Sequence, residues 1–295
     1  MNFSCKVMRK KIFFAVLLSA SMATSSAQDG TLLRIGTYNL RMQNMDKNTP
    51  DRWELRHQRC IQSILDNGFD ILGVQEIADF AQDQLSADLA KDYACIFFSP
   101  YNANGKGGKA SGIFYKKKRF KKLSYHYFWI SDTPGVPSDN DHFQYKGKQR
   151  SYKRGGACAV FKDRLTGRKI FFMNHHGIIN KEENLKYAGI LVDIEKKYNP
   201  KGYPSFFVGD FNVRADHPSH KLWRAYWSDA ADIALPRQCT MNAFDPNPDN
   251  WQKARHIDYI YHRNAGTPLW YTVNQKLYDG RCASDHFPVW ADFKL

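Results

Sequence analysis

Two polar side chains end an apolar run in the second half of the chain. The run Phe206–Gly209 is followed by Asp210 and Asn212, with Phe211 between them. In an extended backbone, side chains two positions apart point to the same side, so Asp210 and Asn212 can act on one reacting centre. A carboxylate can position water or bind a metal ion, and a carboxamide can donate a hydrogen bond to a developing oxyanion. A strand end without function has the same pattern. Other segments of the chain must therefore show whether Asp210 and Asn212 belong to a functional site.

Polar side chains also stand at the ends of the other apolar runs. They are acids, amides and imidazoles: Asn39, Glu76, His175, His176, Asp258, Asp285 and His286. Active sites of α/β proteins gather where strand ends meet loops. Each residue alone has a structural explanation, because Glu76 could cap a surface element, Asp258 could bond within a turn, and either adjacent histidine could be a core residue. Their recurrence at strand ends predicts one shared site.

Short strands and amphipathic helices are expected to position these residues. Apolar patterning predicts strands at 32–38, 70–75, 94–98, 112–116, 125–130, 157–162, 169–174, 205–210, 255–262, 269–274 and 288–293. Helices are predicted from Asp51, as N-cap, to Asn67-Gly68, and at 80–90, 181–197 and 217–227. Irregular loops are predicted at 131–153 and 236–253, and a mobile glycine- and lysine-rich loop at 102–111, which lacks the spacing of a P-loop.

Strands joined by short loops in some places and by helices in others predict a mixed α/β fold. The expected number of strands, about ten to twelve, exceeds what one open twisted sheet usually holds. We therefore expect two packed sheets with helices outside them. The length of 295 residues suits this as a single large domain.

Residues 1–27 are predicted to be a signal peptide. Basic residues between Lys6 and Lys11 precede the apolar run Ile12–Ala20, and Ser25-Ser26-Ala27 provides the small residues of a cleavage site. The apolar run is too short to anchor the chain in a bilayer. We expect export to a periplasm or beyond, and a mature domain that covers residues 28–295.

The chain is strongly basic. Its formal charge is +14, and removal of the four basic and no acidic residues within 1–27 lowers it to +10. Such a charge favours polyanionic partners such as nucleic acids, phospholipid surfaces or sugar phosphates, although basic exported proteins are common. Much of the excess lies in the basic run Lys116–Lys122, and such a run is more often a solvated strand end or turn than a binding patch. Five scattered cysteines remain without C-x-x-C spacing, so a zinc–thiolate site is disfavoured, while one or two disulfides could form.

Six segments resemble, in order, the motifs of the endonuclease/exonuclease/phosphatase superfamily, the fold of DNase I. They are Thr37-Tyr38-Asn39-Leu40-Arg41, Gln75-Glu76, Asn174-His175-His176, Gly209-Asp210-Phe211-Asn212, His256-Ile257-Asp258-Tyr259-Ile260 and Ser284-Asp285-His286-Phe287-Pro288. The resemblance spans nearly the whole mature chain. It implies a DNase I-like four-layer α/β sandwich of two packed mixed β-sheets flanked by helices. It also implies hydrolysis of phosphate mono- or diesters with a divalent cation, usually Mg²⁺ or Mn²⁺.

The resemblance implies a metal site at the first two strand ends and near the C-terminus. Glu76 matches the principal metal ligand of the family, assisted by Asn39 and Asp285. Carboxylate and amide oxygens are hard ligands that suit Mg²⁺ and leave positions open for water and phosphate.

The same resemblance implies how water attacks the phosphate. Asp210 would orient or deprotonate the attacking water, and Asn212 would hold a phosphate oxygen as charge grows. His286, paired with Asp258, would contact the phosphate as an imidazolium, because the carboxylate raises its pKa. His176 matches the second phosphate-contacting histidine of the family.

Two segments depart from the family pattern. Thr is common in the family where His175 stands, and an acidic residue and a further histidine usually follow soon after; here Gly177-Ile178-Ile179 follows. The Arg of an Arg-x-x-Thr-Trp run is kept as Arg154, but the Trp is lost. We expect Arg154 and His175 to bind substrate, and these departures leave the choice of substrate open.

The sequence thus predicts an exported, divalent-metal-dependent phosphoesterase. Its substrate could be a nucleic acid, as for DNase I-like endonucleases, a small phosphorylated molecule or a phospholipid. A non-catalytic binding module is the alternative of another class, but it would be marked by loss of Glu76, Asp210 or His286, and all are retained. We expect a monomer without stable membrane insertion.

Overall fold

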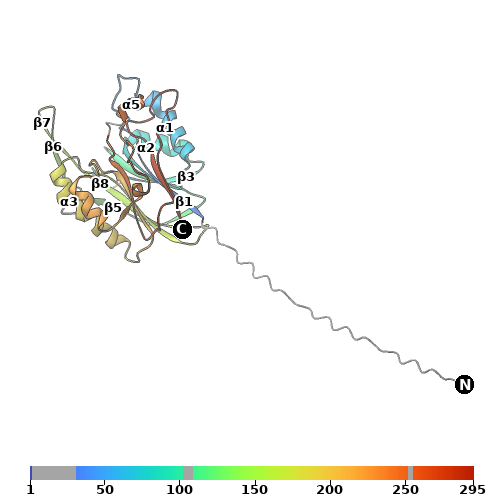
Figure 1. The fold of residues 1–295 in the computed structure, drawn as a ribbon. Coiled ribbons are helices and arrows are strands. Elements are labelled where there is room, and N and C mark those ends of the chain that lie inside the picture. Colours follow the sequence, from blue (N-terminus) through green and yellow to red (C-terminus); the bar gives the residue numbers. More distant parts are fainter. Residues whose placement is uncertain (2–30, 102–108, 252–254) are drawn as a thin grey trace. The chain divides into compact units, whose positions relative to one another are not determined.

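Two mixed six-stranded β-sheets form the centre of the chain (Figure 1). The computed structural model describes Met1 and residues 31–101, 109–251 and 255–295, so the predicted signal peptide and part of the predicted 102–111 and 236–253 loops lie outside the described residues. In strand order the first sheet is β13 (Trp270–Val273), β14 (Val289–Lys294), β1 (Leu32–Asn39), β2 (Ile71–Ile77), β4 (Ala110–Lys116) and β3 (Tyr93–Phe98). The second is β11 (Ser228–Asp229), β12 (Asp258–Arg263), β10 (Ser205–Asp210), β9 (Lys169–His176), β8 (Gly155–Asp163) and β5 (Phe120–Trp129).

Both sheets have the same pairing pattern, with one parallel pair at the centre. β1 pairs with β2, and β10 pairs with β9, in parallel, whereas all other pairs are antiparallel. β1 faces β10 across the sandwich, and β2 faces β9. The carboxyl ends of these four strands meet at one end of the sandwich, which we call the polar end. Because β12 and β14 run antiparallel to their neighbours, they begin there too.

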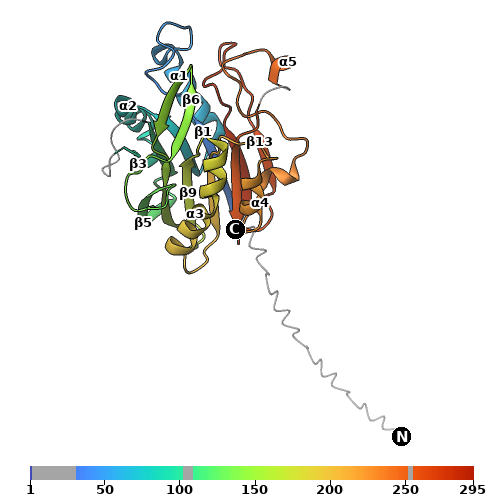
Figure 2. The same ribbon diagram turned by 90° about the vertical axis from the view of Figure 1, so that its left-hand side faces the viewer.

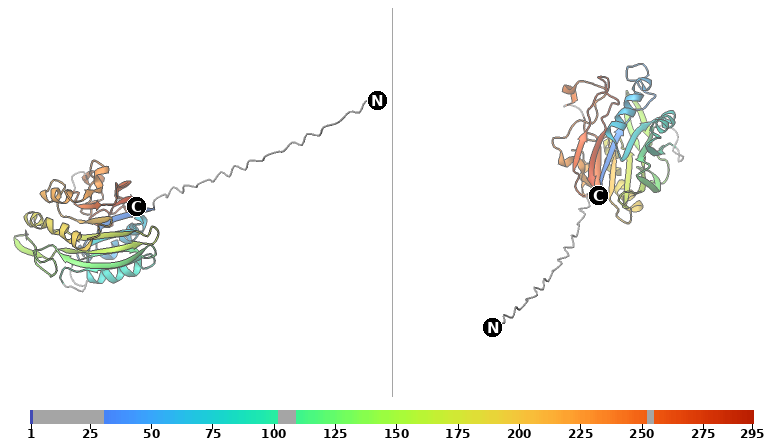
Figure 3. Two further views of the ribbon diagram at one scale, coloured as in Figure 1. Left: turned by 90° about the horizontal axis from the view of Figure 1, so that it is seen from below. Right: turned by 90° about the vertical axis from the view of Figure 1, so that its right-hand side faces the viewer.

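Apolar side chains fill three layers between and outside the sheets. The middle cluster lies between the sheets and includes Ile35, Ile71, Phe172, Val208 and Val289. Helices α1 (Trp53–Asn67) and α2 (Asp79–Leu89) cover the outer face of the first sheet, and α3 (Lys181–Tyr198) and α4 (Pro218–Arg224) cover the second (Figures 1 and 3). In the left view of Figure 3 the cyan helix α2 and the yellow helix α3 lie on opposite sides of the strands. The expected four-layer α/β sandwich is confirmed.

A buried polar bridge joins the two sheets beneath the polar end. Gln75 Nε2 donates a hydrogen bond to Asn174 Oδ1 at 2.7 Å, and Asn174 Nδ2 donates to the backbone oxygens of Val74 and Gly112 at 3.0 and 2.8 Å. A Cβ atom at Gly73 would lie 2.6 Å from Asn174 Oδ1, so only glycine leaves room for the bridge. Partners in the first sheet therefore satisfy the amide of Asn174, whereas Gln75 Oε1 is buried without a hydrogen-bond partner among the described residues.

The helix termini show which sequence signals were reliable. The predicted stop of α1 is confirmed, because Gly68 takes the left-handed conformation at its C-cap. The predicted N-cap is wrong, because the helix begins at Trp53. Asp51 Oδ1 instead accepts a hydrogen bond from Arg281 Nη2 at 2.8 Å. At α3, Asn180 accepts hydrogen bonds from two backbone N–H groups and caps the helix.

The predicted irregular loops contain short regular elements. Residues 131–153 include a hairpin of β6 (Asp141–Tyr145) and β7 (Lys148–Tyr152), whose turn residues Lys146 and Gly147 both have positive φ. Lys-Gly lacks the usual Asn-Gly signal for this turn, which is why the hairpin was missed. The second loop contains α5 (Pro248–Trp251). Figures 1 and 2 show the hairpin and α5 away from the C-terminus.

The basic run Lys116–Lys122 lies at the opposite end of the sandwich from the polar end, because β4 is antiparallel to β2. Its charges are partly neutralised by acids. Lys116 Nζ lies 3.0 Å from Asp70 Oδ1, and Arg119 bridges Asp70 and Asp163 at 2.7 and 2.9 Å. Lys116 and Arg119 of the run thus belong to a salt-bridge network far from the polar end.

The described residues show no disulfide and no membrane-spanning helix. The cysteines Cys60, Cys95, Cys158, Cys239 and Cys282 are free. Among the helices that the structure describes, none combines the length and apolar character needed to cross a bilayer.

Candidate active site

Asp210, the last residue of β10, is the centre of a buried polar cluster. Its Oδ2 accepts a hydrogen bond from Asn39 Nδ2 at 3.0 Å, and lies 3.6 Å from His176 Nε2 and 3.9 Å from His286 Nε2. Its Oδ1 accepts a hydrogen bond from the backbone N–H of Asn212 at 2.9 Å. This carboxylate therefore contacts residues from both sheets.

The environment of Asp210 favours its protonated form more than water would. Burial and the negative charge of Asp258 raise the pKa of Asp210 to about 7, although His286 and the hydrogen bonds from Asn212 and Asn39 act in the opposite direction. A carboxylate with a pKa near neutrality can both accept and release a proton at physiological pH.

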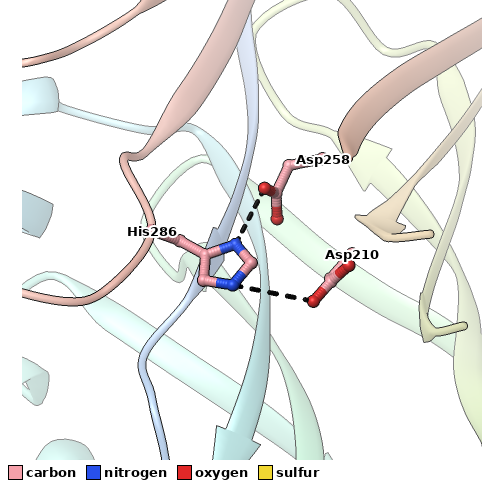
Figure 4. A group of neighbouring side chains, drawn as sticks. All are labelled: Asp210, Asp258 and His286. Atoms are coloured by element: carbon pink, nitrogen blue, oxygen red, sulfur yellow. Dashed lines mark hydrogen bonds and ion pairs between the residues drawn. The ribbon is translucent and has the colours of Figure 1, made fainter. Parts of the chain in front are cut away.

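Asp258, His286 and Asp210 form a line of alternating charge (Figure 4). His286 Nδ1 donates a hydrogen bond to Asp258 Oδ2 at 2.9 Å, while Nε2 faces Asp210. Burial lowers the pKa of His286, but Asp258, Asp285 and Asp210 outweigh this effect and raise it to about 10. The ring is therefore an imidazolium at neutral pH, with Nε2–H directed into the cluster.

Glu76 occupies a strained position near the end of β2. Its φ of +59° lies in the left-handed region, and the pairing of β2 with β4 shifts register between Val74 and Ile77. Such an irregularity re-aims a side chain, and strain of this kind is common at functional sites. Glu76 Oε2 accepts a hydrogen bond from the backbone N–H of Met42 at 3.1 Å, and Oε1 lies 3.9 Å from His176 Nε2.

The donor set at Glu76, Asp285 and Asn39 fits a divalent cation. Burial and the charge of Glu76 raise the pKa of Asp285, despite His286 and Arg41. Two buried carboxylates thus repel each other, and a cation between them would relieve this repulsion. Together with the amide oxygen of Asn39, they are hard oxygen ligands of the kind that Mg²⁺ and Mn²⁺ prefer.

Asp210, Asp258 and His286 also come within 4.8 Å of one another and could geometrically surround an ion. The chemistry disfavours this alternative. His286 Nδ1 is already bonded to Asp258, and Nε2 would have to lose the proton that the surrounding carboxylates favour before it could bind a metal. The oxygen donors of Glu76, Asp285 and Asn39 are therefore the chemically better matched candidate ligands.

His176 and Asn212 add neutral donors to the cluster. Burial and the charges of Arg154, Lys109 and His286 lower the pKa of His176 well below its ordinary value, so its ring is neutral. Asn212 takes a positive φ of 58°, and its Nδ2 donates to the backbone oxygen of Gly177 at 2.9 Å. One of its two amide hydrogens remains for another acceptor.

Arg154, for which substrate binding is predicted, lies at the margin of the polar end. Together with Lys109 it lines a small cavity beside His176. Its Nε donates to Oδ2 of the fully buried Asp141 at 2.7 Å. Oδ1 of Asp141 accepts hydrogen bonds from the backbone N–H groups of Ile179 and Asn180, both at 2.9 Å. The guanidinium is therefore held by a buried carboxylate that is itself fixed.

The prediction that His175 binds substrate is wrong. Adjacent residues of a strand point to opposite faces, so His175 faces α3 while His176 faces the cluster. Its ring centroid lies 4.7 Å from that of Phe207 and 4.4 Å from that of Phe211, and Nδ1 is 3.4 Å from the backbone oxygen of Val208. Burial lowers the pKa of His175 to about 3, so it is a neutral core residue.

Charged residues that were not predicted for the site also lie at the polar end. Arg41 Nη1 is 3.4 Å from Asp285 Oδ2, and the positive charge of Lys109 lowers the pKa of Glu76 against the effect of burial. Arg41 closes the first matching motif and could have been inferred from it. Lys109 and Asp141 lie in segments without apolar periodicity, where the sequence carries no comparable signal.

Comparison with known proteins adds independent information. Residues 36–286 match the model of the Endonuclease/Exonuclease/phosphatase family. Comparison with curated protein sequences gave no match.

Solved structures with the same fold cover most of the chain. A family protein and a mannosyl-6-phosphatase, both from Bacteroides thetaiotaomicron, are each 28% identical to it. Their TM-scores are 0.78 and 0.77, over 90% and 89% of this chain and 98% and 100% of theirs. A Bacteroides vulgatus endonuclease/exonuclease/phosphatase at 24% identity has a TM-score of 0.78, over 90% of this chain and 99% of its own.

Proposed function

The chain belongs to the endonuclease/exonuclease/phosphatase family, and from this premise we propose that it is an exported, magnesium-dependent phosphatase of small phosphomonoesters. Members of the family are metal-dependent phosphoric ester hydrolases, so the class of reaction follows from membership. The observation that supports a working catalytic site is the contact of Asp210 with the pair formed by Asp258 and His286.

In the proposed reaction, Asp210 accepts a proton from water that attacks the phosphorus atom in line with the leaving alcohol. Its pKa of about 7 matches this task at neutral pH. The imidazolium of His286 and the free amide hydrogen of Asn212 donate hydrogen bonds to phosphate oxygens as negative charge grows on them. His176, as a neutral ring, donates to the phosphate without adding charge.

Glu76, Asp285 and Asn39 would hold Mg²⁺, or Mn²⁺ in its place. When bound, the ion supplies Lewis-acid stabilisation of the charge on the phosphate. The chain itself contributes the two buried carboxylates, and Arg41 Nη1 lies 3.4 Å from Asp285 Oδ2.

A small monoester is the favoured substrate. The mannosyl-6-phosphatase among the structural relatives acts on a sugar monoester, as its name states. A monoester carries more negative charge than a diester, and Lys109 and Arg154 place two cations beside His176. The basic run Lys116–Lys122, which favoured nucleic acid in the sequence, lies at the other end of the sandwich.

A nucleic acid is the second candidate substrate, in the manner of a DNase I-like endonuclease. The hairpin of β6 and β7 exposes Lys146, Lys148 and Arg150, and its second strand leads directly to Arg154. Basic side chains of this kind could follow a phosphate backbone. A non-catalytic binding module is not supported, because the residues of the proposed site are retained and connected.

Export and the monomeric state are proposals from sequence. Export rests on the basic, apolar and small-residue pattern of residues 1–27.

Hydrolysis assays of residues 28–295 test the proposed function. p-Nitrophenyl phosphate, hexose 6-phosphates, bis-p-nitrophenyl phosphate and plasmid DNA are offered with Mg²⁺, Mn²⁺ or EDTA. We expect monoesters to be hydrolysed with a kcat/KM at least about tenfold above the diester, and activity to be lost in EDTA. Activity unchanged by EDTA would refute the mechanism. Preferred DNA cleavage that falls steeply with salt would identify a nuclease instead.

A further inference from the structure

A cavity of about 360 Å³ lies in the segment that precedes Asp258. Its lining among the described residues consists of Met241, Asn242, Ala243, Asp245, Asn250, Trp251 and Arg255. The volume falls at the lower end of the range typical of small-molecule sites, roughly 300–1,000 Å³. None of these side chains takes part in the proposed catalytic cluster.

The cavity adjoins the backbone of two residues of that cluster. Met241 forms an antiparallel bridge with His286, and the backbone N–H groups of Asn242 and Ala243 donate to the backbone oxygen of Asp285 at 2.7 and 3.0 Å. A molecule in this cavity would therefore lie beside the proposed site of phosphate hydrolysis.

Asn242 supplies a donor that the described residues do not use. The residue is 3% exposed, and its Oδ1 accepts a hydrogen bond from the backbone N–H of Phe244 at 2.7 Å. Its Nδ2 is buried and has no hydrogen-bond partner among the described residues. Buried polar groups are nearly always paired, so this amide is expected to bond to a molecule in the cavity.

The lining has an apolar part and a polar part. Met241, Ala243 and Trp251 are apolar, whereas Asp245, Asn250 and Arg255 carry hydrogen-bonding groups. Asp245 is fixed by Asn250, whose Nδ2 donates to Asp245 Oδ2 at 2.7 Å. A sugar ring matches this arrangement, because it has an apolar C–H face and hydroxyls that both donate and accept. A second phosphate matches it less well, since Asp245 would repel it.

We propose that this cavity binds the sugar ring of a phosphorylated sugar, with its phosphate at the cluster around Asp210. The inference rests on the proposed phosphatase function, and it specifies that the alcohol released from the phosphate ester is a sugar. Asn242 donates to a ring hydroxyl, and Arg255 at the exposed margin contacts another.

The test compares two substrates that share the phosphate and differ in the alcohol. kcat/KM is measured for hexose 6-phosphates and for p-nitrophenyl phosphate with Mg²⁺, in the wild type, Asn242→Ser and Arg255→Ala. Serine keeps an oxygen for the N–H of Phe244 and removes the amide donor. Asn247→Ser, in the same segment but outside the cavity, and Arg168→Ala, at the far end of the sandwich, are the matched controls.

We expect the ratio of kcat/KM for hexose 6-phosphate to that for p-nitrophenyl phosphate to fall about five- to tenfold in each cavity variant, and to stay within about twofold in the controls. An unchanged ratio in both cavity variants overturns the inference and leaves the phosphatase function intact.

Binding of free hexose separates the inference from the proposed function. Saturation-transfer NMR with free mannose and glucose needs no hydrolysis, and Asn242→Ser should weaken the signal. Hexose binding lost in Asn242→Ser, without hydrolysis of any monoester by the wild type, would support the cavity and refute the phosphatase. Absence of hexose binding together with monoester hydrolysis would refute the sugar site in the cavity and support the phosphatase function.

Discussion

Replacement of Asp258 by Asn removes one buried charge and keeps the shape of the side chain. Asp258 Oδ2 accepts the hydrogen bond from His286 Nδ1 at 2.9 Å, and its charge raises the pKa of both His286 and Asp210. Asp258→Asn should therefore lower both pKa values in one variant. His286 would lose its proton more readily, and Asp210 would ionise more readily.

The magnitude follows from the pKa of His286. A value of about 10, against an ordinary 6.5, corresponds to roughly 5 kcal/mol of preference for the charged ring. Burial opposes this preference, and Asp258 is the largest of the three carboxylates that supply it. An opposite charge in contact changes a pKa by about 1–3, so the pKa of His286 in the variant should fall by at least about 1.

The same shift predicts a dependence of stability on pH. Below a pH of about 6.5, His286 is protonated in both the folded and the unfolded chain, and the stabilisation from its charged pair is complete. Between this pH and about 10 only the folded chain keeps the proton, so the free energy of unfolding decreases as the pH rises. Asp258→Asn should make this decrease smaller.

NMR titration of the histidine side chains in metal-free protein measures the pKa directly, with His286→Gln used to assign the resonance. Thermal unfolding between pH 6.5 and 10 measures the stability, and Asp193→Asn on the exposed face of α3 is the control. A pKa of His286 near 6.5 in the wild type, or an unchanged pKa in Asp258→Asn, would refute the reasoning.

Other substitutions test the remaining assignments. Asp210→Asn should lower kcat by about 10²–10⁴-fold, as loss of a general base does. Thermal unfolding near pH 8 should show no loss of stability, because burial and Asp258 make the ionised form of Asp210 unfavourable in the wild type. Activity within about tenfold of the wild type would contradict the assignment. Glu76→Gln should abolish the rise in Tm that Mg²⁺ gives to the wild type, which calorimetry with and without Mg²⁺ measures. Asp141→Asn should raise KM for monoesters about five- to tenfold with kcat little changed, because Arg154 loses its buried partner; an equal fall in kcat would point to a structural effect. His175→Phe should leave KM unchanged, since the ring packs in the core, and a raised KM would return His175 to the substrate site.

The fold and the polar cluster followed from sequence because the same feature encodes both. Apolar runs that end in Asn39, Glu76, His176 and Asp210 define strands and also mark where the strands stop. Once β1–β2 and β9–β10 are parallel pairs, their ends must meet, so the linear pattern was enough to predict a shared site.

Other features depend on information that the linear pattern lacks. His175 and His176 have the same chemistry, and only the face of β9 on which each lies separates a core residue from a site residue. The sequence of the basic run Lys116–Lys122 favoured a solvated turn over a binding patch, but only the direction of β4 shows that it lies at the far end of the sandwich. The contact of Asp141 with Arg154 could not be predicted from the sequence, because the hairpin turn that brings them together carries no standard sequence signal.

The buried bridge between Gln75 and Asn174 joins two halves with different tasks. The first sheet presents the residues proposed to hold the metal, and the second presents Asp210, His176 and Asp258. Because the two sheets share one pairing pattern, each half resembles a complete unit, but neither holds both the metal ligands and the base. Hydrolysis therefore requires both sheets packed against each other, because only their contact brings the proposed base beside the proposed metal ligands.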